Sequence, residues 1–346
     1  MPERVVGIAS DVAALTKEKL GKVADVATAT KMLAINAAIE AAHAGSDGAG
    51  FAVVAKEVGT VADEVRDLSE QLNEQLAPMV ADLMQLGDLL VWQVRGTRLA
   101  DLALHVIDLI DRNLYERSCD VRWWATDSAV VDACTEPTPE ACAYASHRLG
   151  VILSSYTVYL DLAIADVNGK VIAHGRPGRY RLGAGTDVST QGWFVEAMKT
   201  RRGSEFAVVD VYQSRTLEGA TVAVYSTAVR AGARDDGEII GALGIFFDWA
   251  PQAHAIVTGV DLTDEERART RVMLVDHDHL VLAASDGQGI LTERIDLSQA
   301  ESPTSGVFRR TDGTMVGYRL TPGYETYRGL GWYGVITQAP PDLSQY

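Results

Sequence analysis

The sequence predicts a multi-domain protein in which an all-α antiparallel coiled-coil hairpin is followed by an α+β region of two related modules. Residues 3 to about 133 are rich in alanine, leucine and charged residues, as helices are, and one glycine-rich segment interrupts that pattern early. From about Tyr156 onward, β-branched and aromatic runs alternate with Gly, Asp and Asn turns. A length of 346 residues also exceeds what one ordinary core accommodates.

The composition is that of a globular protein, with 47% hydrophobic and 23% charged residues. A formal net charge of −16 argues against binding to nucleic acid or to an anionic membrane surface. The longest apolar run, Ile239–Phe247, is far shorter than the roughly 20 residues of a membrane-spanning helix, and no charged-then-apolar leader opens the sequence. We therefore expect no membrane span and a cytoplasmic location, with reduced thiols at Cys119, Cys134 and Cys142.

The predicted hairpin has its turn near residue 47. Ala34–Ala44 strongly favours a helix, residues 45–50 (GSDGAG) do not continue one comfortably, and helical periodicity resumes at Phe51. On the return leg, apolar residues follow alternating steps of four and three, which predicts a coiled-coil seam and a dimeric four-helix bundle. The seam consists of Val54, Val58, Val61, Val65, Leu68 and Leu72.

Further helices are predicted beyond the seam. Pro78 coincides with a four-residue stutter in the apolar pattern and lacks a backbone N–H, so we expect the helix to kink or stop there. Amphipathic patterns then predict one helix from Leu99 to about Leu114 and another over roughly Val121–Ala133. Arg117 and Asp120 would be neighbours on such a helix, packed against the sheet that follows.

The first β-rich module opens with a strong hairpin signal, because Asn168-Gly169 separates the strands Val158–Asp166 and Val171–His174. The later strands and helical patches complete an α+β unit. The predicted strands are Phe206–Tyr212, Thr221–Val229 and Ile239–Phe247, and the helical patches lie near Trp193–Thr200 and Tyr144–Ser155.

A second, smaller module is predicted from residue 259 onward. Its opening, MLVDHDHLVLAAS, is similar to LAIADVNGKVIAHG of the first module, which indicates a weak internal repeat. Its strands are Arg271–Asp276, His279–Ala284, Gly306–Arg310, Met315–Leu320 and Trp332–Gln338.

Lys31–Gly59 resembles the hairpin tip of methyl-accepting chemotaxis proteins. The residues that match the family pattern are Asn36–Ala42, Gly45, Gly48, Gly50–Ala55, Glu57 and Val58. In that family the tip binds a histidine kinase and a coupling adaptor and packs receptor dimers into larger clusters. The resemblance implies a signalling protein, not an enzyme, whose partner-binding residues are Asn36, Ile39, Glu40, Phe51, Val54 and Glu57.

The tip also departs from the family pattern. His43, Ala49 and Gly59 stand where the family usually has arginine, and Lys31 stands where it usually has asparagine. These departures leave open an alternative, in which the protein is a non-taxis sensor or dimerisation protein whose degenerate hairpin docks another partner. The glutamates of the return leg lack the small residue expected three positions after a methylated pair, so no methylation site is predicted.

The remainder, from about Leu90 to Gln338, resembles a double Cache sensor, in which a long helix carries two PAS-like modules and the first usually holds a small ligand. The similarity rests on Gly185–Met198, Ile239–Trp249 and Gly329–Gln338. We expect a hairpin at 1–90, a helical connector at 91–149, the ligand-binding module at 150–258 and the second module at 259–346.

The resemblance implies a ligand between the first sheet and the loop that crosses it. In amino-acid-binding members an arginine lies two residues before the tryptophan and an aspartate lies in the last strand, where this chain has Gln191 and Phe246. A neutral, aromatic or apolar ligand is therefore expected. Core packing of Trp193, strand-face positions of the tyrosines and a strand-ending Asp210 are the structural alternatives. The candidate ligand residues are Gln191, Trp193, Phe194, Asp210, Tyr212, Tyr225 and Asp248.

The sequence gives little support for a metal, cofactor or catalytic site. His277 and His279 lie two residues apart without a further ligand, so we interpret His277–His279 as a turn and expect no metal or cofactor. No catalytic arrangement stands out. The combined expectation is a soluble chemoreceptor that senses a cytosolic small molecule and regulates a chemotaxis-type histidine kinase.

Overall fold

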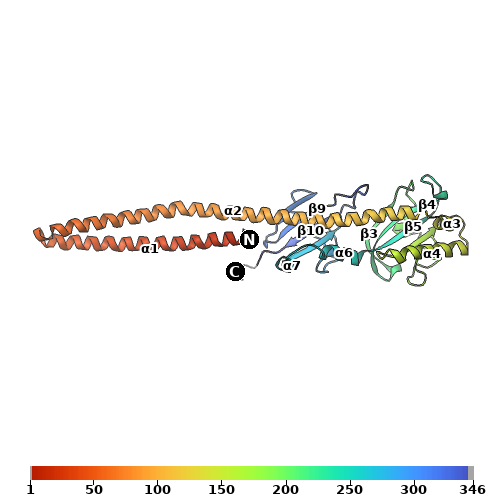
Figure 1. The fold of residues 1–346 in the computed structure, drawn as a ribbon, viewed down its shortest axis with the longest axis horizontal. Coiled ribbons are helices and arrows are strands. Elements are labelled where there is room, and N and C mark those ends of the chain that lie inside the picture. Colours follow the sequence, from red (N-terminus) through yellow and green to blue (C-terminus); the bar gives the residue numbers. More distant parts are fainter. Residues whose placement is uncertain (1, 342–346) are drawn as a thin grey trace. The chain divides into compact units, whose positions relative to one another are not determined.

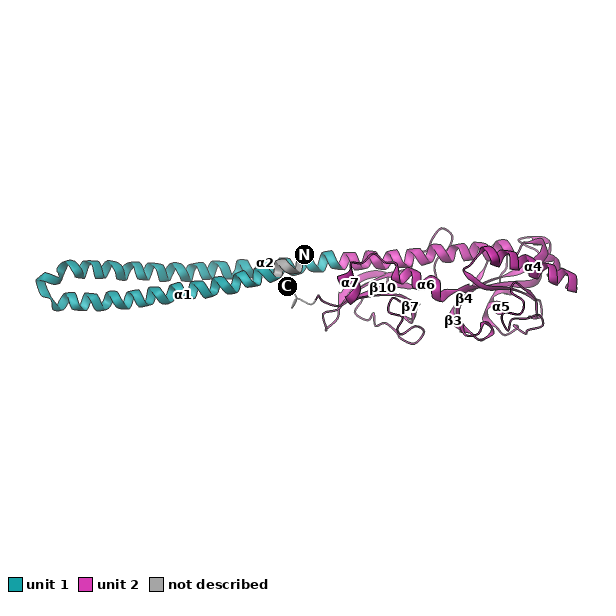
Figure 2. Ribbon diagram, turned by 60° about the horizontal axis from the view of Figure 1, so that its bottom comes forward, with its two compact units in different colours: residues 1–95 teal, residues 96–346 magenta. Residues whose placement is uncertain are grey.

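The computed structural model describes residues 2–341, with side chains from residue 7 onward. The chain divides into two compact units, residues 1–95 and 96–346 (Figure 2). Unit 1 is a helical hairpin in which α1 (Pro2–His43), the short helix η1 (Gly45–Gly48) and the first part of α2 (Ala49–Trp124) follow one another (Figure 1). The predicted hairpin and its turn are therefore confirmed.

The turn depends on glycine at two positions. Gly45 has φ +62°, a left-handed conformation that glycine adopts without strain. A Cβ on Gly48 would lie 2.0 Å from the carbonyl oxygen of Ala41, so no larger residue fits there. The return helix begins at Ala49, two residues earlier than the sequence pattern indicated.

Small residues close the hairpin. Buried positions recur every seven residues on both helices, at Ala27, Ala34 and Ala41 of α1 and at Ala55, Ala62 and Ser69 of α2. Small side chains allow two helix backbones to approach closely. The larger apolar residues of the predicted seam are not used in this contact, because the seam positions from Val54 to Leu72 are 37–60% exposed.

Helix α2 corrects two predictions. It continues from Ala49 to Trp124 through Pro78, so the proline does not interrupt it, and the predicted Leu99–Leu114 helix is part of α2. A proline removes only one N–H from a helix that has long flanks on both sides. The predicted Val121–Ala133 helix is wrong as a single element. α2 ends at Trp124, and Asp127 caps a separate helix α3 (Ser128–Thr135) by accepting a hydrogen bond from the N–H of Ala129.

Unit 2 contains two five-stranded antiparallel sheets. The first has the order β2-β1-β5-β4-β3, and its predicted strands are confirmed apart from small shifts at their ends. Its elements are α4 (Pro139–Ser155), β1 (Tyr159–Asp166), β2 (Val171–His174), α5 (Gly192–Ala197), β3 (Ala207–Ser214), η2 (Arg215–Leu217), β4 (Ala220–Arg230), η3 (Ala231–Ala233), β5 (Ile239–Asp248) and α6 (Trp249–Thr258).

The second sheet repeats the topology of the first, in the order β7-β6-β10-β9-β8. Its elements are α7 (Asp264–Arg269), β6 (Thr270–Val275), β7 (Val281–Ala284), β8 (Ser305–Arg309), β9 (Met315–Leu320) and β10 (Tyr333–Gln338). Two glycines bring this sheet close to α2. A Cβ on Gly317 would lie 2.7 Å from the carbonyl carbon of Leu99, and one on Gly334 would lie 2.1 Å from the carbonyl oxygen of Ala103.

The internal repeat extends to the detail of the turns. Asp166 at the end of β1 and Asp276 directly after β6 each accept, through Oδ1, hydrogen bonds from backbone N–H groups two and four residues later. Gly169 (φ +75°) and His279 (φ +64°) occupy the same left-handed position in the two turns. The weak sequence repeat thus corresponds to a repeated structure. Among the described residues, no helix has a stretch both long and apolar enough to cross a bilayer.

Candidate functional site

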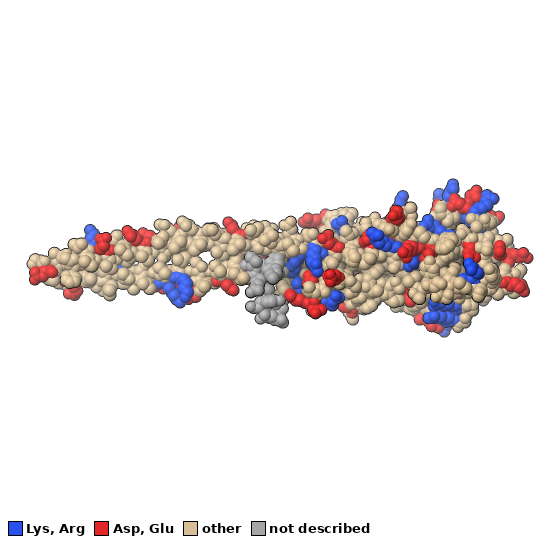
Figure 3. Space-filling view, viewed as in Figure 1, with Lys and Arg blue, Asp and Glu red and all other residues tan. Residues whose placement is uncertain are grey.

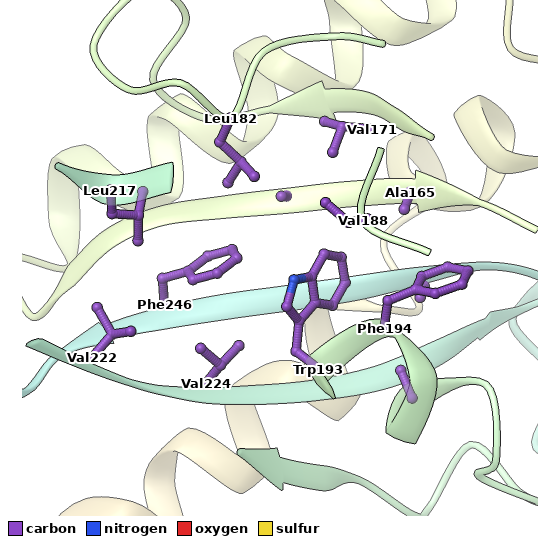
Figure 4. Packing of buried hydrophobic residues seen from close by; sticks show 13 residues of the cluster. Ala165, Val171, Leu182, Val188, Trp193, Phe194, Leu217, Val222, Val224 and Phe246 are labelled. Carbon is purple, nitrogen blue, oxygen red and sulfur yellow. The ribbon is translucent and has the colours of Figure 1, made fainter. Parts of the chain in front are cut away.

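Trp193 lies at the centre of the first module. It follows the first residue of α5, is 1% exposed and lies against β5, where Gly244 leaves room for the indole. A Cβ on Gly244 would come within 2.8 Å of Trp193 Cε3. The rings of Phe194 and Phe246 meet the indole edge-to-face, with centroids 6.0 and 5.9 Å away (Figure 4).

The surroundings of Trp193 are apolar. Figure 4 shows Leu182 and Val188 directed toward the same space from loops, Leu217 from η2, and Val222 and Val224 from β4. We call this cluster of buried apolar residues the Trp193 cluster. Trp193 makes polar contacts with the side chains of Gln191 and Ser226. Its Nε1 donates to Gln191 Oε1 at 2.9 Å, and its backbone carbonyl accepts a hydrogen bond from the Ser226 hydroxyl at 2.7 Å.

Two further candidate residues lie around this cluster. Tyr212 packs against it, and burial raises the pKa of its phenol. Asp248 ends β5, where burial raises the pKa of its carboxyl and the nearby charges of Arg176 and Arg179 oppose that rise. Trp193, Phe194, Gln191 and Tyr212 thus share one region, with Asp248 at the end of the strand.

Tyr225 and Asp210 lie elsewhere. Val224 and Val209 contact the Trp193 cluster, so their neighbours Tyr225 and Asp210 project from the opposite face of the sheet. There Tyr225 Oη lies 3.1 Å from Tyr327 Oη of the second module, and burial raises its pKa well above the usual value. These two candidates therefore connect the modules and do not contact the Trp193 cluster.

Asp210 contacts the second module through Trp332, whose Nε1 donates to Asp210 Oδ2 at 3.2 Å. Burial raises the pKa of Asp210 despite that bond. Asp276 and His277 approach it, with one ligand atom from each residue within 4.8 Å of the others. Oδ1 of Asp276 is already occupied by the turn that follows β6, in keeping with the interpretation of this segment as a turn.

Several buried polar groups were not predicted. Asp161, inside the apolar strand β1, is fully buried, and its Oδ2 lies 3.0 Å from Nδ1 of His174. Tyr159 donates to Asp120 of α2 at 2.5 Å. The expected proximity of Arg117 and Asp120 is confirmed, with Arg117 Nε 3.4 Å from Asp120 Oδ2. An isolated aspartate in an apolar strand is the only sequence signal for the first of these pairs.

The hairpin tip has a groove of about 530 Å³ between α1 and α2, lined by apolar residues with Glu40 and Asp47 beside them. Phe51 is the most exposed large hydrophobic residue here, at 76%. All six tip residues implied by the resemblance are exposed, namely Asn36, Ile39, Glu40, Phe51, Val54 and Glu57.

Comparison with known proteins separates the two units. Residues 8–92 match the methyl-accepting chemotaxis protein (MCP) signalling domain. McpQ, a methyl-accepting chemotaxis protein of Pseudomonas putida, is 48% identical over 64 residues, which are 17% of this chain and 10% of McpQ. The transducer protein MpcT of Halobacterium salinarum is 60% identical over 48 residues, or 14% of this chain and 6% of MpcT. The matches thus span a tenth or less of these relatives.

Solved structures are similar to the remainder of the chain. The sensor domain of the histidine kinase DctB of V. cholerae has a TM-score of 0.56 at 14% identity, covering 72% of this chain and 99% of that domain. The ligand-binding domain of the Campylobacter jejuni chemoreceptor Tlp3, solved with L-valine, has a TM-score of 0.53 at 19% identity, covering 72% and 94%. At these identities the likeness concerns the fold. Residues 8–92 of the chain therefore match an MCP signalling domain, and the chain also contains a region with the fold of the sensor and ligand-binding domains of these solved structures.

Proposed function

We propose that the protein is a chemoreceptor, in which the Cache-like region binds a small molecule and the hairpin regulates a chemotaxis-type histidine kinase through a coupling adaptor. One observation carries this proposal. Helix α2 (Ala49–Trp124) contains both the return leg of the hairpin and the helix on which the second sheet packs. A ligand that favours one of two arrangements of this helix by a few kcal/mol would shift the output population.

The signalling form is proposed to be a homodimer. The seam residues of α2, Val54 to Leu72, remain exposed in the single hairpin, and the apolar groove beside them measures about 890 Å³. On the face of unit 1 seen in Figure 3, most side chains are uncharged and the charged ones form a few small groups. Full burial of a valine or leucine contributes about 1.5–3 kcal/mol, so pairing two hairpins into a four-helix bundle would be strongly favoured.

The tip is the proposed surface for the kinase and the adaptor, and for larger clusters of receptors. Phe51, Ile39 and Val54 provide exposed apolar contacts, and Glu40 and Glu57 provide charge beside them. Such an arrangement of apolar centre and charged rim is typical of protein interfaces.

The proposed ligand is a small neutral compound, aromatic or apolar, held near Trp193, Phe194, Gln191 and Tyr212. The residues packed around Trp193 are apolar, and the Gln191 side chain that contacts its indole N–H is a neutral amide. Because Trp193 and its neighbouring rings fill this space, ligand binding would require their displacement. Tyr225 and Asp210 would then transmit the change to the second module.

We propose that the sensor lies in the cytosol with the hairpin. Charged side chains recur at short intervals along α2 between the seam and the sensor, among them Glu74, Asp82, Asp88 and Arg98. Placing a charged side chain at the centre of a bilayer costs free energy, so this part of α2 is better suited to an aqueous environment than to a membrane.

A reconstituted assay tests the proposal. The full chain, a chemotaxis histidine kinase and its adaptor are mixed, and kinase autophosphorylation is measured with and without a compound identified by thermal shift among neutral aromatic and aliphatic molecules. We expect the compound to change kinase activity, and Phe51→Ala to abolish the effect while ligand binding persists. Val167→Ala, which truncates an exposed valine of the sensor, is the control.

A different result of this assay would favour the alternative, a non-taxis sensor or dimerisation protein whose hairpin docks another partner. The observation that favours this alternative is that Lys31, which pairs with Asp63, stands where the family usually has asparagine. Ligand binding and dimerisation without any kinase response would support that non-taxis sensor and exclude the kinase proposal.

A further inference from the structure

A small cavity lies beside the C-terminal end of α2, apart from the Trp193 cluster. Its volume is about 180 Å³, and its walls come from the last turns of α2, the connection to α3, the loop before β3, and the end of β4 with η3. A single water molecule needs only about 10–15 Å³, so the cavity can hold a small polyatomic ligand. Three arginines line it, Arg122, Arg230 and Arg234.

Arg230 is a buried cation without a carboxylate partner. Its side chain projects from the end of β4, and the residue is 7% exposed. Its two terminal nitrogens donate to backbone carbonyls, those of Gly237 at 2.9 Å and Thr200 at 2.6 Å, while Nε has no hydrogen-bond partner. Within residues 7–341, no aspartate or glutamate forms an ion pair with it. Burial of an uncompensated charge is unfavourable, so a counter-ion would stabilise this region.

Arg122 in the last turn of α2 is also without an acidic partner among the described side chains. It donates to the Ser118 carbonyl at 2.7 Å, and its contacts with the Ser118 hydroxyl and the Ser204 carbonyl are long, at 3.4 and 3.3 Å. Its contact with Cys119 Sγ, at 3.4 Å, is to a weak acceptor. The guanidinium lies over the ring of Phe206, 5.5 Å from its centroid. Its terminal nitrogens can therefore exchange weak contacts for a stronger acceptor.

The acidic groups nearby do not balance these charges. Asp235 lines the cavity, but its Oδ1 accepts from the Ser204 N–H at 2.9 Å and its Oδ2 pairs with Arg202 at 3.1 Å. Arg234 pairs with Asp236 at 3.1 Å, where both side chains are well exposed and easily rearranged. The carbonyl end of α2 disfavours an anion, but three guanidinium groups outweigh a partial charge of about one half.

We infer that this cavity binds a small oxyanion, a phosphate or a carboxylate, through Arg122 and Arg234, with Arg230 as a fixed positive charge at its wall. Arginine presents paired N–H donors that match both kinds of anion. The bound anion would join the end of α2 to the β4–β5 connection. The inference is independent of the proposed ligand at Trp193 and of kinase control.

The test uses the full chain with inorganic phosphate and, separately, acetate, in a buffer without other oxyanions. Thermal shift and calorimetric titration are expected to show saturable binding of at least one probe. Binding of phosphate alone indicates a phosphate site, and binding of acetate indicates a carboxylate site. Arg122→Gln and Arg234→Gln should each weaken binding at least about tenfold, since each removes a charge-assisted contact.

Arg215→Gln is the matched control, because it removes the same charge from an exposed position of η2 outside the cavity. It should bind the probe with wild-type affinity. The inference is overturned if neither probe binds, or if Arg215→Gln weakens binding as much as the two cavity variants, which would indicate a general charge effect. Circular dichroism of each variant verifies its fold.

Discussion

Lys31 and Asp63 join the two helices of the hairpin, with Lys31 Nζ 2.5 and 2.7 Å from the two carboxylate oxygens of Asp63. On α1 this contact lies about one helical turn before the buried Ala34. Lys31 is one of the positions at which the sequence departs from the pattern of chemoreceptor tips. The departure thus brings an ion pair that links the legs of the hairpin.

The ion pair predicts a pH-dependent contribution to hairpin stability. The hydrogen bond from Lys31 lowers the pKa of Asp63 below its usual 3.8. A carboxyl whose pKa is lower in the folded state stabilises the fold above its unfolded pKa, and this contribution is lost as pH falls through the folded pKa. Lys31→Asn should therefore speed hydrogen exchange of tip amides, relative to wild type, at about pH 6 but progressively less as pH falls through the folded pKa of Asp63. Lys22→Asn, which breaks an ion pair within α1, is the control. An equal effect of both variants on hydrogen exchange would contradict the prediction.

The contact between Gln191 and Trp193 predicts a difference between two substitutions. Gln191→Leu leaves the indole N–H without its acceptor, which should reduce the free energy of unfolding by about 1–3 kcal/mol. Gln191→Glu retains an acceptor at the same length and should lose less. Denaturant unfolding measures both values. Equal losses would mean that the side chain contributes packing and not a hydrogen bond.

A substitution at Gly244 tests whether Trp193 packs at the centre of the first module. Gly244→Ala would place a Cβ 2.8 Å from Trp193 Cε3, so the indole must move. We expect a loss of about 1–3 kcal/mol of stability, as for other overpacked cores, together with altered tryptophan fluorescence. Gly183→Ala is the control, since a Cβ there meets no atom within 4 Å. An unchanged stability of Gly244→Ala would contradict the packing described for this site.

The local elements of this fold could be predicted from the sequence, whereas the contacts between them could not. Asn168-Gly169 specifies its hairpin through the conformation that glycine allows, so β1 and β2 were predictable. The face on which Tyr225 lies depends on how β4 packs, and composition alone does not distinguish its two faces. The apolar seam was visible in the sequence, but the alanines that close the hairpin contribute little to an apolar pattern.

Asp210 predicts a second pH dependence, of opposite sign. Burial raises its pKa above 3.8 in the folded state, so the folded protein binds the proton more tightly than the unfolded chain does. Stability from this group is present below the unfolded pKa and decreases as pH rises through the folded pKa. Asp210→Asn should remove that decrease, so the variant gains stability relative to wild type between about pH 4 and pH 7. Chemical denaturation across this range measures the effect, and a constant difference between the two proteins would contradict it.

The exposed seam predicts the oligomeric state. Val61→Glu places a charge at a seam position that is 51% exposed in the single hairpin, so it should spare the hairpin fold and prevent pairing of two hairpins. Sedimentation is expected to show a dimer for the wild type and a monomer for the variant. Val151→Glu alters a similarly exposed valine of α4 in the sensor, at 45%, and should remain dimeric. A buried glutamate without a partner is strongly disfavoured at such an interface. A wild type that is monomeric at all concentrations, or a dimer that persists in Val61→Glu, would therefore mean that the seam has another role.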